Sequence, residues 1–95
     1  MNQPEISIVV PVYNGEATIA QCIESLLALD YPKDKYEIVV VDNASTDGTA
    51  KILDNYPVRV LPENRRGACC ARNTGWRAAA YDLIAFTDSD CRVEK

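Results

Sequence analysis

The chain has 95 residues, enough for one domain, and its 47% hydrophobic and 25% charged residues argue against disorder. Its formal net charge is −4, and without a basic cluster beyond Arg65-Arg66 it lacks the electrostatic footprint of a nucleic-acid-binding protein. No signal peptide begins the chain and no apolar run reaches the ~20 residues of a membrane span, so any anchor of a longer parent protein would lie beyond Lys95.

Strand and helix patterns alternate from the start of the chain. The run Ile6–Val12 begins with β-branched residues typical of a strand buried on both faces of a parallel sheet. A helix is predicted next, ending before Pro32, with Thr18 and Gln21 as a candidate capping box. Its apolar stripe consists of Ile19, Cys22, Ile23, Leu26, Leu27 and Leu29. Tyr36–Val41 is the second predicted strand.

The second half repeats this alternation. Ser45–Gly48 offers N-cap hydroxyls and an early acid for a helix reaching about Tyr56. Val58–Leu61 is predicted as a short strand, Ala68–Ala80 as an alanine-rich helix and Leu83–Phe86 as the fourth strand. The order βαβαβαβ, with long crossovers, predicts an α/β fold in which a Rossmann-like parallel sheet is flanked by helices.

Polar residues follow three of the predicted strands. The first strand leads into Tyr13–Glu16, the second into Asp42-Asn43 and the fourth into Asp88-Ser89-Asp90. Ligands of open parallel sheets bind outside the carboxyl ends of the strands. We therefore expect one crevice at this edge, holding an anionic ligand through a metal.

The pair Asp88 and Asp90 is the strongest of these signals. Carboxylates one residue apart suit a hard cation such as Mg²⁺ or Mn²⁺, whereas the alternative is a solvated turn with a local hydrogen bond. The preceding apolar strand and the companion strand ends favour the metal. In that interpretation Asp90 ligates directly, and Asp88 holds a ligand hydroxyl or a metal-bound water.

Three further residues are candidates for ligand contact. Asp42 could be an N-cap, but Ser45 and Thr46 supply capping groups, so we expect Asp42 to accept a hydrogen bond from a ligand. Tyr13 offers a flat face on which a base could stack. Arg72 lies within a predicted helix and is expected to be partly buried near a phosphate or an acidic partner.

The remaining notable residues have structural interpretations. Arg65 is expected to form a surface charge pair, and Trp76 and Tyr81 are expected to pack in the core or at its edge. The four cysteines show no CxxC spacing and the chain has no histidine. Reduced thiols in a cytoplasmic protein are therefore expected, with Cys69-Cys70 packing a helix rather than forming a vicinal disulfide.

These blocks, in this order, resemble the family 2 glycosyltransferases of the GT-A fold, specifically their nucleotide-binding amino-terminal half. The resemblance runs from Ile6 to about Cys91 and is carried by SIVVPVYNGEATIAQCIESLLALDYP, EIVVVDNASTDGTAKIL, ENRRGACCARNTG and IAFTDSDC. It implies that residues 1–95 form one nucleotide-diphospho-sugar-binding domain, truncated after the DxD motif Asp88-Ser89-Asp90. Cys91 departs from the family, since many members carry another Asp there.

The resemblance also implies roles for single residues. Pro11, Tyr13 and Glu16 would line the nucleoside pocket, Asp42 would read the base, and Arg72 would lie beside the nucleotide-sugar. The DxD carboxylates would hold the ribose and a divalent metal, Mg²⁺ or Mn²⁺. A UDP-sugar is the favoured donor, and an acceptor hydroxyl would attack the anomeric carbon with inversion.

The activity of the chain by itself is left open. Family members continue well beyond this length and supply the acceptor site and the general base there, so no catalytic residue is expected before Lys95. The alternatives to a transferase domain are a non-catalytic nucleotide-binding module and an inactive fragment. The truncation also predicts an exposed edge and apolar surface at Leu83–Phe86, and hence self-association.

Three other classes fit the motifs less well. A dehalogenase-like phosphatase would place a small residue and Thr after the second Asp, where this chain has Cys91-Arg92. A response-regulator receiver needs an acidic pair after its first strand, where Pro11–Asn14 stands. A dinucleotide-binding oxidoreductase needs a GxGxxG turn, which is absent.

Overall fold

The computed structural model of the chain describes residues 4–65 and 67–87, in which strands and helices alternate. The strands are β1 (Ile6–Val12), β2 (Tyr36–Asp42), β3 (Arg59–Pro62) and β4 (Leu83–Phe86). The helices are α1 (Ile19–Leu27), α2 (Thr49–Leu53) and α3 (Ala68–Ala78), and a short 3₁₀ turn, η1 (Lys33–Lys35), precedes β2. The strands pair in parallel in the order β3-β2-β1-β4, which confirms the predicted α/β fold.

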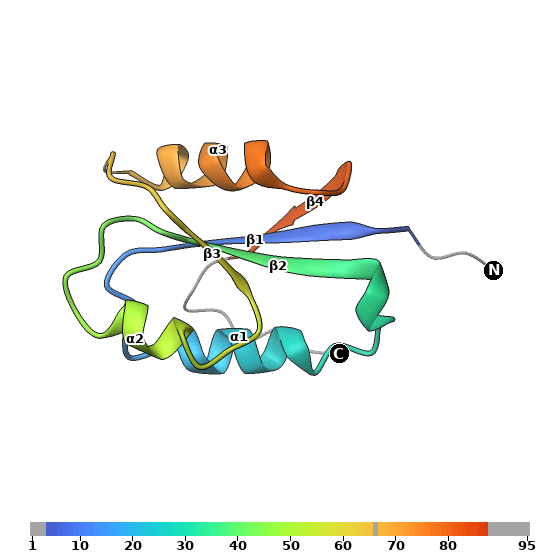
Figure 1. The fold of residues 1–95 in the computed structure, drawn as a ribbon, viewed down its shortest axis with the longest axis horizontal. Coiled ribbons are helices and arrows are strands. Elements are labelled where there is room, and N and C mark those ends of the chain that lie inside the picture. Colours follow the sequence, from blue (N-terminus) through green and yellow to red (C-terminus); the bar gives the residue numbers. More distant parts are fainter. Residues whose placement is uncertain (1–3, 66, 88–95) are drawn as a thin grey trace.

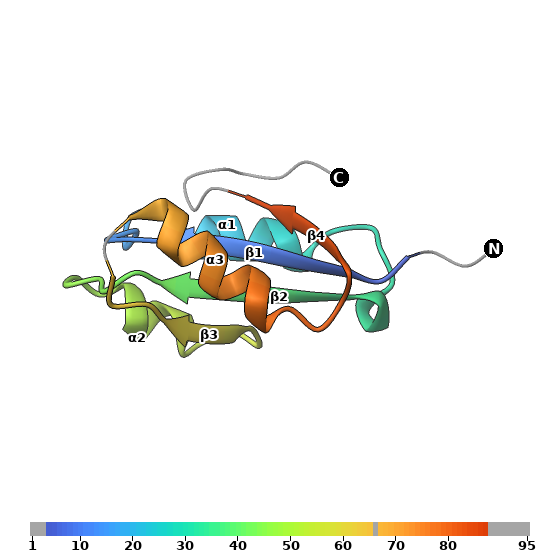
Figure 2. The same ribbon diagram turned by 90° about the horizontal axis from the view of Figure 1, so that it is seen from above.

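Helices cover both faces of this sheet. Figure 1 shows α3 on one side and α1 with α2 on the other, and Figure 2 shows α3 crossing over the middle strands. Successive residues of β1 serve opposite layers: Val10 packs in the core under α1, while Val9 packs with Ala71 of α3. Because both faces are covered, apolar residues run continuously along β1 and β2 instead of alternating with polar ones.

Helix α3 lies unusually close to the sheet at Gly75. A Cβ atom there would lie 2.3 Å from Cγ1 of Val9 and 3.1 Å from Cγ2 of Val41. The glycine therefore has a packing reason, although it lowers the intrinsic helix propensity of the segment. The same close approach makes Ala71 and Gly75 the sheet-facing residues of α3.

Two predicted packing and capping roles are wrong. Trp76 is 56% exposed, because the small residues of α3 face the sheet and the large side chain is left on the outside; Tyr81 is half-buried. The capping box of Thr18 and Gln21 is not formed. Instead, the backbone amides of Thr18 and Ile19 donate to the carbonyl of Gly15, at 3.0 and 2.8 Å.

Element bounds differ from the predictions mainly in the second half of the chain. Helix α2 ends at Leu53 instead of near Tyr56, which is consistent with Pro57 disfavouring helical backbone at the preceding residue. Helix α3 ends at Ala78, two residues before the predicted end, and β3 begins at Arg59, one residue later than predicted.

The strand order places a topological switch beside β1. After β1 the chain adds β2 and β3 on one side, and α3 then carries it back across the sheet to β4 on the other side. Crevices for ligands form at the carboxyl ends of the strands where the order reverses. The predicted site residues follow β1, β2 and β4, the strands next to this switch.

Candidate functional site

The ends of β1 and β2 lie side by side. In the parallel register Val12 is opposite Asp42, so Tyr13 and Asn43 begin neighbouring loops. Both loops lie at the end of the molecule drawn on the left of Figures 1 and 2. The structure therefore brings Tyr13 and Asp42 to one edge of the sheet, as the sequence predicted.

Asn14 joins the two loops. Its backbone amide donates to Oγ of Ser45 at 2.9 Å, and its Oδ1 accepts from the amide of Thr46 at 2.7 Å. Asn14 has a φ of 51°, a left-handed conformation that Asn tolerates better than most residues. The predicted capping of α2 by Ser45 and Thr46 is wrong, because both residues are engaged by the loop after β1.

Glu16 and Gly15 make a second set of bonds to the start of α2. The Gly15 amide donates to Oγ1 of Thr49 at 3.0 Å, and Oε1 of Glu16 accepts from the Gly48 amide at 2.5 Å. The Glu16 amide donates to Oδ2 of Asp47 at 3.2 Å. The Thr49 hydroxyl, donating to the same carboxyl, is the main cause that lowers the pKa of Asp47. These bonds fix the shape of the rim formed by residues 13–16 after β1 and residues 42–48 after β2.

Asp42 is half-buried at the centre of this rim. Its Oδ1 accepts a hydrogen bond from the Ser45 amide at 3.1 Å, so the carboxylate is partly used by the turn. Asp42 was expected to be free for a ligand because other residues would cap the helix. For Oδ1 this expectation is wrong, since the Ser45 amide already donates to it. Within residues 4–65 and 67–87 the other oxygen, Oδ2, accepts no hydrogen bond that competes with a ligand.

The remaining nucleoside-pocket candidates differ in exposure. Tyr13 is 42% exposed at the end of β1, and Pro11 is half-buried within the strand, opposite Val41. Glu16 is exposed, but its carboxylate is already bonded to the start of α2. Their roles toward a nucleoside stay predictions.

The sequence analysis missed the structural role of Asn43 beside the candidate site. This residue is only 4% exposed, and its Nδ2 donates to the carbonyls of Glu63 and Arg65, at 2.8 and 2.7 Å. Its Oδ1 accepts from the amide of Gly67 at 3.0 Å. One side chain after β2 therefore shapes the loop between β3 and α3, which contains Gly67 at a φ of 123°.

Glu63 is the second residue that was missed. It is 8% exposed, and its carboxylate accepts from the backbone and guanidinium of Arg65 and from the Thr74 hydroxyl. The hydrogen bonds from Arg65, followed by that from Thr74, lower the pKa of Glu63 to about 2. The ion pair joins Nη2 of Arg65 to Oε1 of Glu63 at 2.9 Å, which confirms the surface charge pair expected for Arg65.

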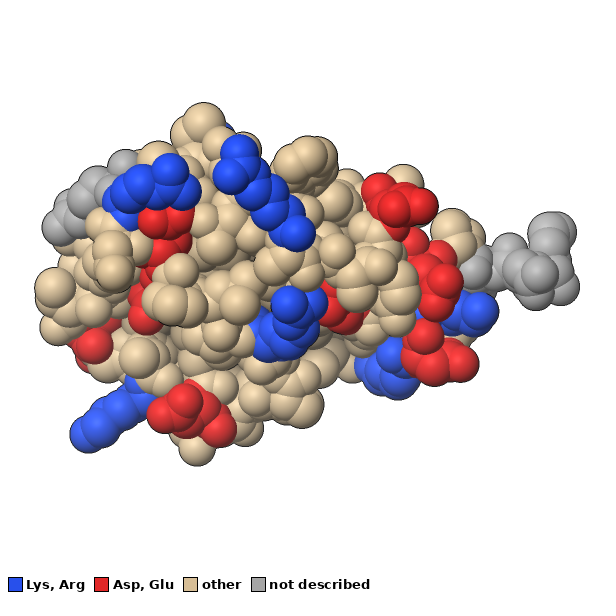
Figure 3. All heavy atoms as spheres, turned by 45° about the horizontal axis from the view of Figure 1, so that its top comes forward, with Lys and Arg blue, Asp and Glu red and all other residues tan. Residues whose placement is uncertain are grey.

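Arg72 is exposed on α3, so the expected partial burial is wrong. Ala71 and Gly75 occupy the sheet-facing side of the helix and leave Arg72 outside. Figure 3 shows the face that carries α3, where the basic side chains of the described residues lie singly or beside acidic ones and form no continuous patch among themselves. A place for Arg72 beside a nucleotide-sugar stays a prediction.

The DxD residues Asp88 and Asp90 lie outside the described residues. The last described residue, Thr87, still donates its amide to the carbonyl of Val9 at 3.0 Å, so the chain leading to them remains beside β1. Among residues 4–65 and 67–87 no three acidic or cysteine side chains are grouped to hold a metal. The metal prediction therefore depends on the two DxD carboxylates, whose hard oxygens suit Mg²⁺ or Mn²⁺.

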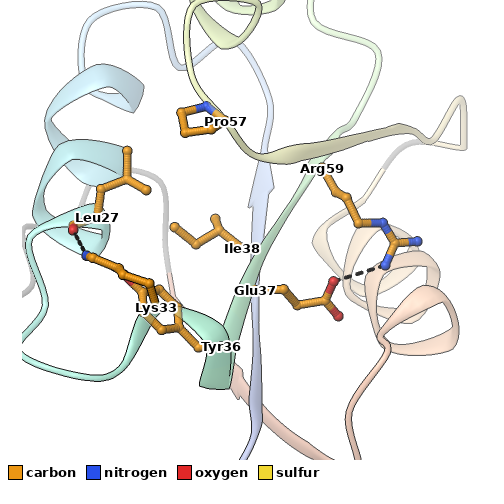
Figure 4. Close-up of a pocket in the computed structure, with 7 residues that line it drawn as sticks. All are labelled: Leu27, Lys33, Tyr36, Glu37, Ile38, Pro57 and Arg59. Carbon is orange, nitrogen blue, oxygen red and sulfur yellow. Dashed lines mark hydrogen bonds and ion pairs between the residues drawn. The ribbon is translucent and has the colours of Figure 1, made fainter.

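A hollow of about 360 Å³ lies at the other end of the sheet. It is lined by Leu27, Lys33, Tyr36, Glu37, Ile38, Pro57 and Arg59 (Figure 4). These residues surround the amino end of β2, and none of the predicted site residues is among them. The hollow is thus distinct from the crevice expected at the carboxyl ends of the strands.

Two further observations concern location. None of the described helices has both the length and the apolar character needed to cross a membrane. Of the described cysteines, Cys22, Cys69 and Cys70 are free thiols.

Comparison with known proteins gives consistent matches. The family model described as Glycosyl transferase family 2 matches residues 7–95. Glycosyltransferase AglE of Haloferax volcanii is 38% identical over 95 residues, which cover 93% of this chain and 31% of AglE. Poly(ribitol-phosphate) beta-N-acetylglucosaminyltransferase TarS of Staphylococcus aureus is 36% identical over 97 residues, covering 96% of this chain and 17% of TarS. The chain thus spans less than a third of the length of these relatives.

Solved structures match the fold closely. TarS 1-349 of S. aureus in complex with UDP superposes with a TM-score of 0.85 and 35% identity, over 90% of this chain and 27% of that one. The mannosyltransferase PcManGT from Pyrobaculum calidifontis, in complex with GDP-Man and Mn²⁺, gives a TM-score of 0.87 and 36% identity, over 94% of this chain and 28% of that one.

Proposed function

Because the chain belongs to glycosyltransferase family 2, we propose that residues 1–95 form the nucleotide-sugar-binding domain of a GT-A glycosyltransferase. The observation that carries the proposal is the register of β1 and β2, which sets Val12 opposite Asp42. It brings Tyr13 and Asp42 to one rim beside the topological switch of the sheet, where ligands of such folds bind. The similar structures that contain UDP or GDP-Man with Mn²⁺ support the same ligand class.

In this proposal the rim binds the nucleoside. Pro11, Tyr13 and Glu16 line the pocket, with the Tyr13 ring as a stacking surface for the base. Asp42 accepts a base N–H through Oδ2, because Oδ1 is held by the Ser45 amide. Uracil, thymine and guanine all offer such an N–H, and the UDP complex of TarS supports a UDP-sugar as the favoured donor. Arg72 lies toward the diphosphate.

The anionic diphosphate also needs positive charge. Asp90, with Asp88, would hold Mg²⁺ or Mn²⁺, and the bound cation supplies charge that stabilises the departing nucleoside diphosphate. The carboxylate chemistry of the DxD pair supports this assignment, as does the Mn²⁺ in the PcManGT complex. The acceptor hydroxyl attacks the anomeric carbon with inversion as the nucleoside diphosphate leaves, and none of the described residues is assigned as the general base that takes its proton.

A nucleotide titration tests the proposal. Calorimetry with UDP, GDP and dTDP, each with and without Mn²⁺, should show binding that is strongest for UDP and depends on the metal. Asp90→Ala should remove the metal dependence, and Asp42→Ala should weaken UDP binding. Asp82→Ala is a matched control, because Asp82 is an exposed carboxylate at the amino end of β4. If none of the three nucleotides bound, the proposed nucleotide-binding function would be refuted and only the fold assignment would stand.

A nucleotide-binding module without transfer activity is the second candidate. It is favoured because no described residue is assigned as the general base. Incubation of the 95-residue chain with a UDP-sugar, Mn²⁺ and a panel of acceptor hydroxyls should then release no UDP beyond slow hydrolysis. Sugar transfer by the chain alone would contradict this candidate.

The open edge of the sheet supports self-association as a further proposal. Among the described residues β4 lies at the end of the strand order, and Leu83 and Phe86 are 50% and 47% exposed, which supports the predicted exposed edge. Exposed apolar edge strands pair readily with a second chain. Sedimentation should show a mass that rises with concentration, and Phe86→Lys should reduce that rise. A monomer at all concentrations would exclude the association.

The location proposed for the domain is the cytoplasm. Free thiols at Cys22, Cys69 and Cys70 are consistent with a reducing compartment.

A further inference from the structure

Glu63 connects three separate parts of the chain near the proposed nucleotide site. Its backbone amide donates to the carbonyl of Asp42 at 3.0 Å, and its own carbonyl accepts from Nδ2 of Asn43 at 2.8 Å. Its carboxylate bonds to Arg65 in the following loop and to Thr74 in α3. One residue thus ties the end of β2 to the helix that carries Arg72.

The carboxylate of Glu63 is fully occupied by these partners. Oε2 accepts from the backbone amide and Nε of Arg65, at 2.9 and 3.1 Å. Oε1 accepts from Nη2 of Arg65 at 2.9 Å and from the Thr74 hydroxyl. A group with four donors directed at it and only 8% exposure has no remaining capacity for a ligand. Its contribution is to hold other groups in place.

We propose that Glu63 is a positioning residue for the nucleotide site, holding Arg65 of the following loop and helix α3 in a fixed relation to Asp42. The inference rests on the proposed function. If Asp42 contacts the base and Arg72 lies toward the diphosphate, their separation must match one ligand. Apolar contacts of Ala71 and Gly75 hold α3 on the face of the sheet. The bonds of Glu63 add a polar link from the helix to the end of β2 beside Asp42.

The chemistry of the position requires a carboxylate. All four partners of Glu63 are donors, and an ionised carboxyl group is an acceptor at both oxygens. A glutamine has nearly the same shape but offers one oxygen and one NH₂ group. That NH₂ would face donors of Arg65 or Thr74 and lose at least one bond. Glu63→Gln therefore loosens the link without removing volume.

Glu37 provides a matched control at the other end of the sheet. Its carboxylate accepts from the Ser7 hydroxyl and the Ala80 amide, both at 2.6 Å, and pairs with Nη1 of Arg59 at 3.1 Å. Figure 4 shows this pair beside the hollow at the amino end of β2. Glu37 thus also ties the chain after α3 to the sheet, through the Ala80 amide, and it lies at the opposite end of β2 from Asp42.

The first measurement compares UDP affinity in the presence of Mn²⁺ for the whole chain, Glu63→Gln and Glu37→Gln, at a temperature where all three are folded. Both variants should unfold at lower urea concentration than the parent. Only Glu63→Gln should bind UDP more weakly, by about tenfold, the loss expected from one charge-assisted hydrogen bond. Equal affinity losses in both variants, or none in Glu63→Gln, would overturn the inference.

A second pair of variants separates positioning from general stability. Thr74→Val removes the hydroxyl that joins α3 to Glu63, whereas Thr74→Ser keeps it. UDP affinity should fall in the first and be retained in the second. Equal affinity in Thr74→Val and the parent would show that the link to α3 does not position the site.

Amide hydrogen exchange tests the inference without nucleotide. Glu63→Gln should accelerate exchange across residues 64–74, and Glu37→Gln across residues 78–82, each leaving the other segment unchanged. Unchanged exchange over 64–74 in Glu63→Gln would refute the positioning role. If the parent chain binds no UDP while exchange changes as expected, the proposed function fails, whereas the holding of α3 by Glu63 is supported.

Discussion

At the scale of single residues, the rim is held by side chains that form hydrogen bonds to backbone groups far away in the sequence. Asn43 shows the principle, because its amide group satisfies two carbonyls and one amide in a loop that begins 20 residues later. Buried polar backbone without partners costs free energy. A side chain placed after β2 therefore gives the loop before α3 its shape and leaves Asp42 beside it.

Glu63 predicts a pH dependence of stability. Its pKa in the folded chain is lowered from 4.5 to about 2, so its ionised form is stabilised by folding. This contribution is fully present above pH 4.5 and is lost as the pH falls toward 2. The urea midpoint of the parent chain should decline over this range, and that of Glu63→Gln should decline less. Parallel declines would show that Glu63 does not titrate differently on folding.

At the scale of elements, the packing of α3 on the sheet depends on Gly75. In an exposed helix Gly→Ala stabilises by about 1 kcal/mol, but here the added Cβ would lie 2.3 Å from Cγ1 of Val9. Overpacking typically costs ~1–3 kcal/mol. We expect Gly75→Ala to lower the free energy of unfolding in urea denaturation.

A double-mutant cycle checks the cause of that loss. Val9→Ala removes the clashing methyl groups, so Gly75→Ala should cost less in the Val9→Ala background than in the parent. If Gly75→Ala lowered the free energy of unfolding equally in both backgrounds, its contact with Val9 would not be the cause of the loss.

At the scale of the whole molecule, ligand binding at the switch point should stabilise the fold. A ligand that binds only the folded state at 100 times its Kd contributes ~2.7 kcal/mol. UDP with Mn²⁺ should therefore raise the Tm by several degrees in calorimetry. Removal of the metal with EDTA should reverse most of the rise, as should Asp90→Ala. A Tm that is unchanged by UDP with Mn²⁺ would contradict nucleotide binding.

The sequence by itself determined the alternation of strands and helices and the parallel sheet. Its signals are local: the β-branched run at Val9 and Val10 and the helical spacing of Ile19 to Leu26 each report on their own segment. It also predicted that the first two strands end next to Tyr13 and Asp42, because each continuous apolar run stops at those polar residues.

The tertiary structure decided which polar groups meet. The bonds of Asn14 to Thr46 and of Glu63 to Thr74 join residues 32 and 11 positions apart, and no local pattern encodes such pairs. It likewise decided that small residues of α3 face the sheet, which leaves Trp76 and Arg72 exposed. Hydrogen-bond partners and burial depend on how separate elements pack, and that packing exists only once the chain has folded.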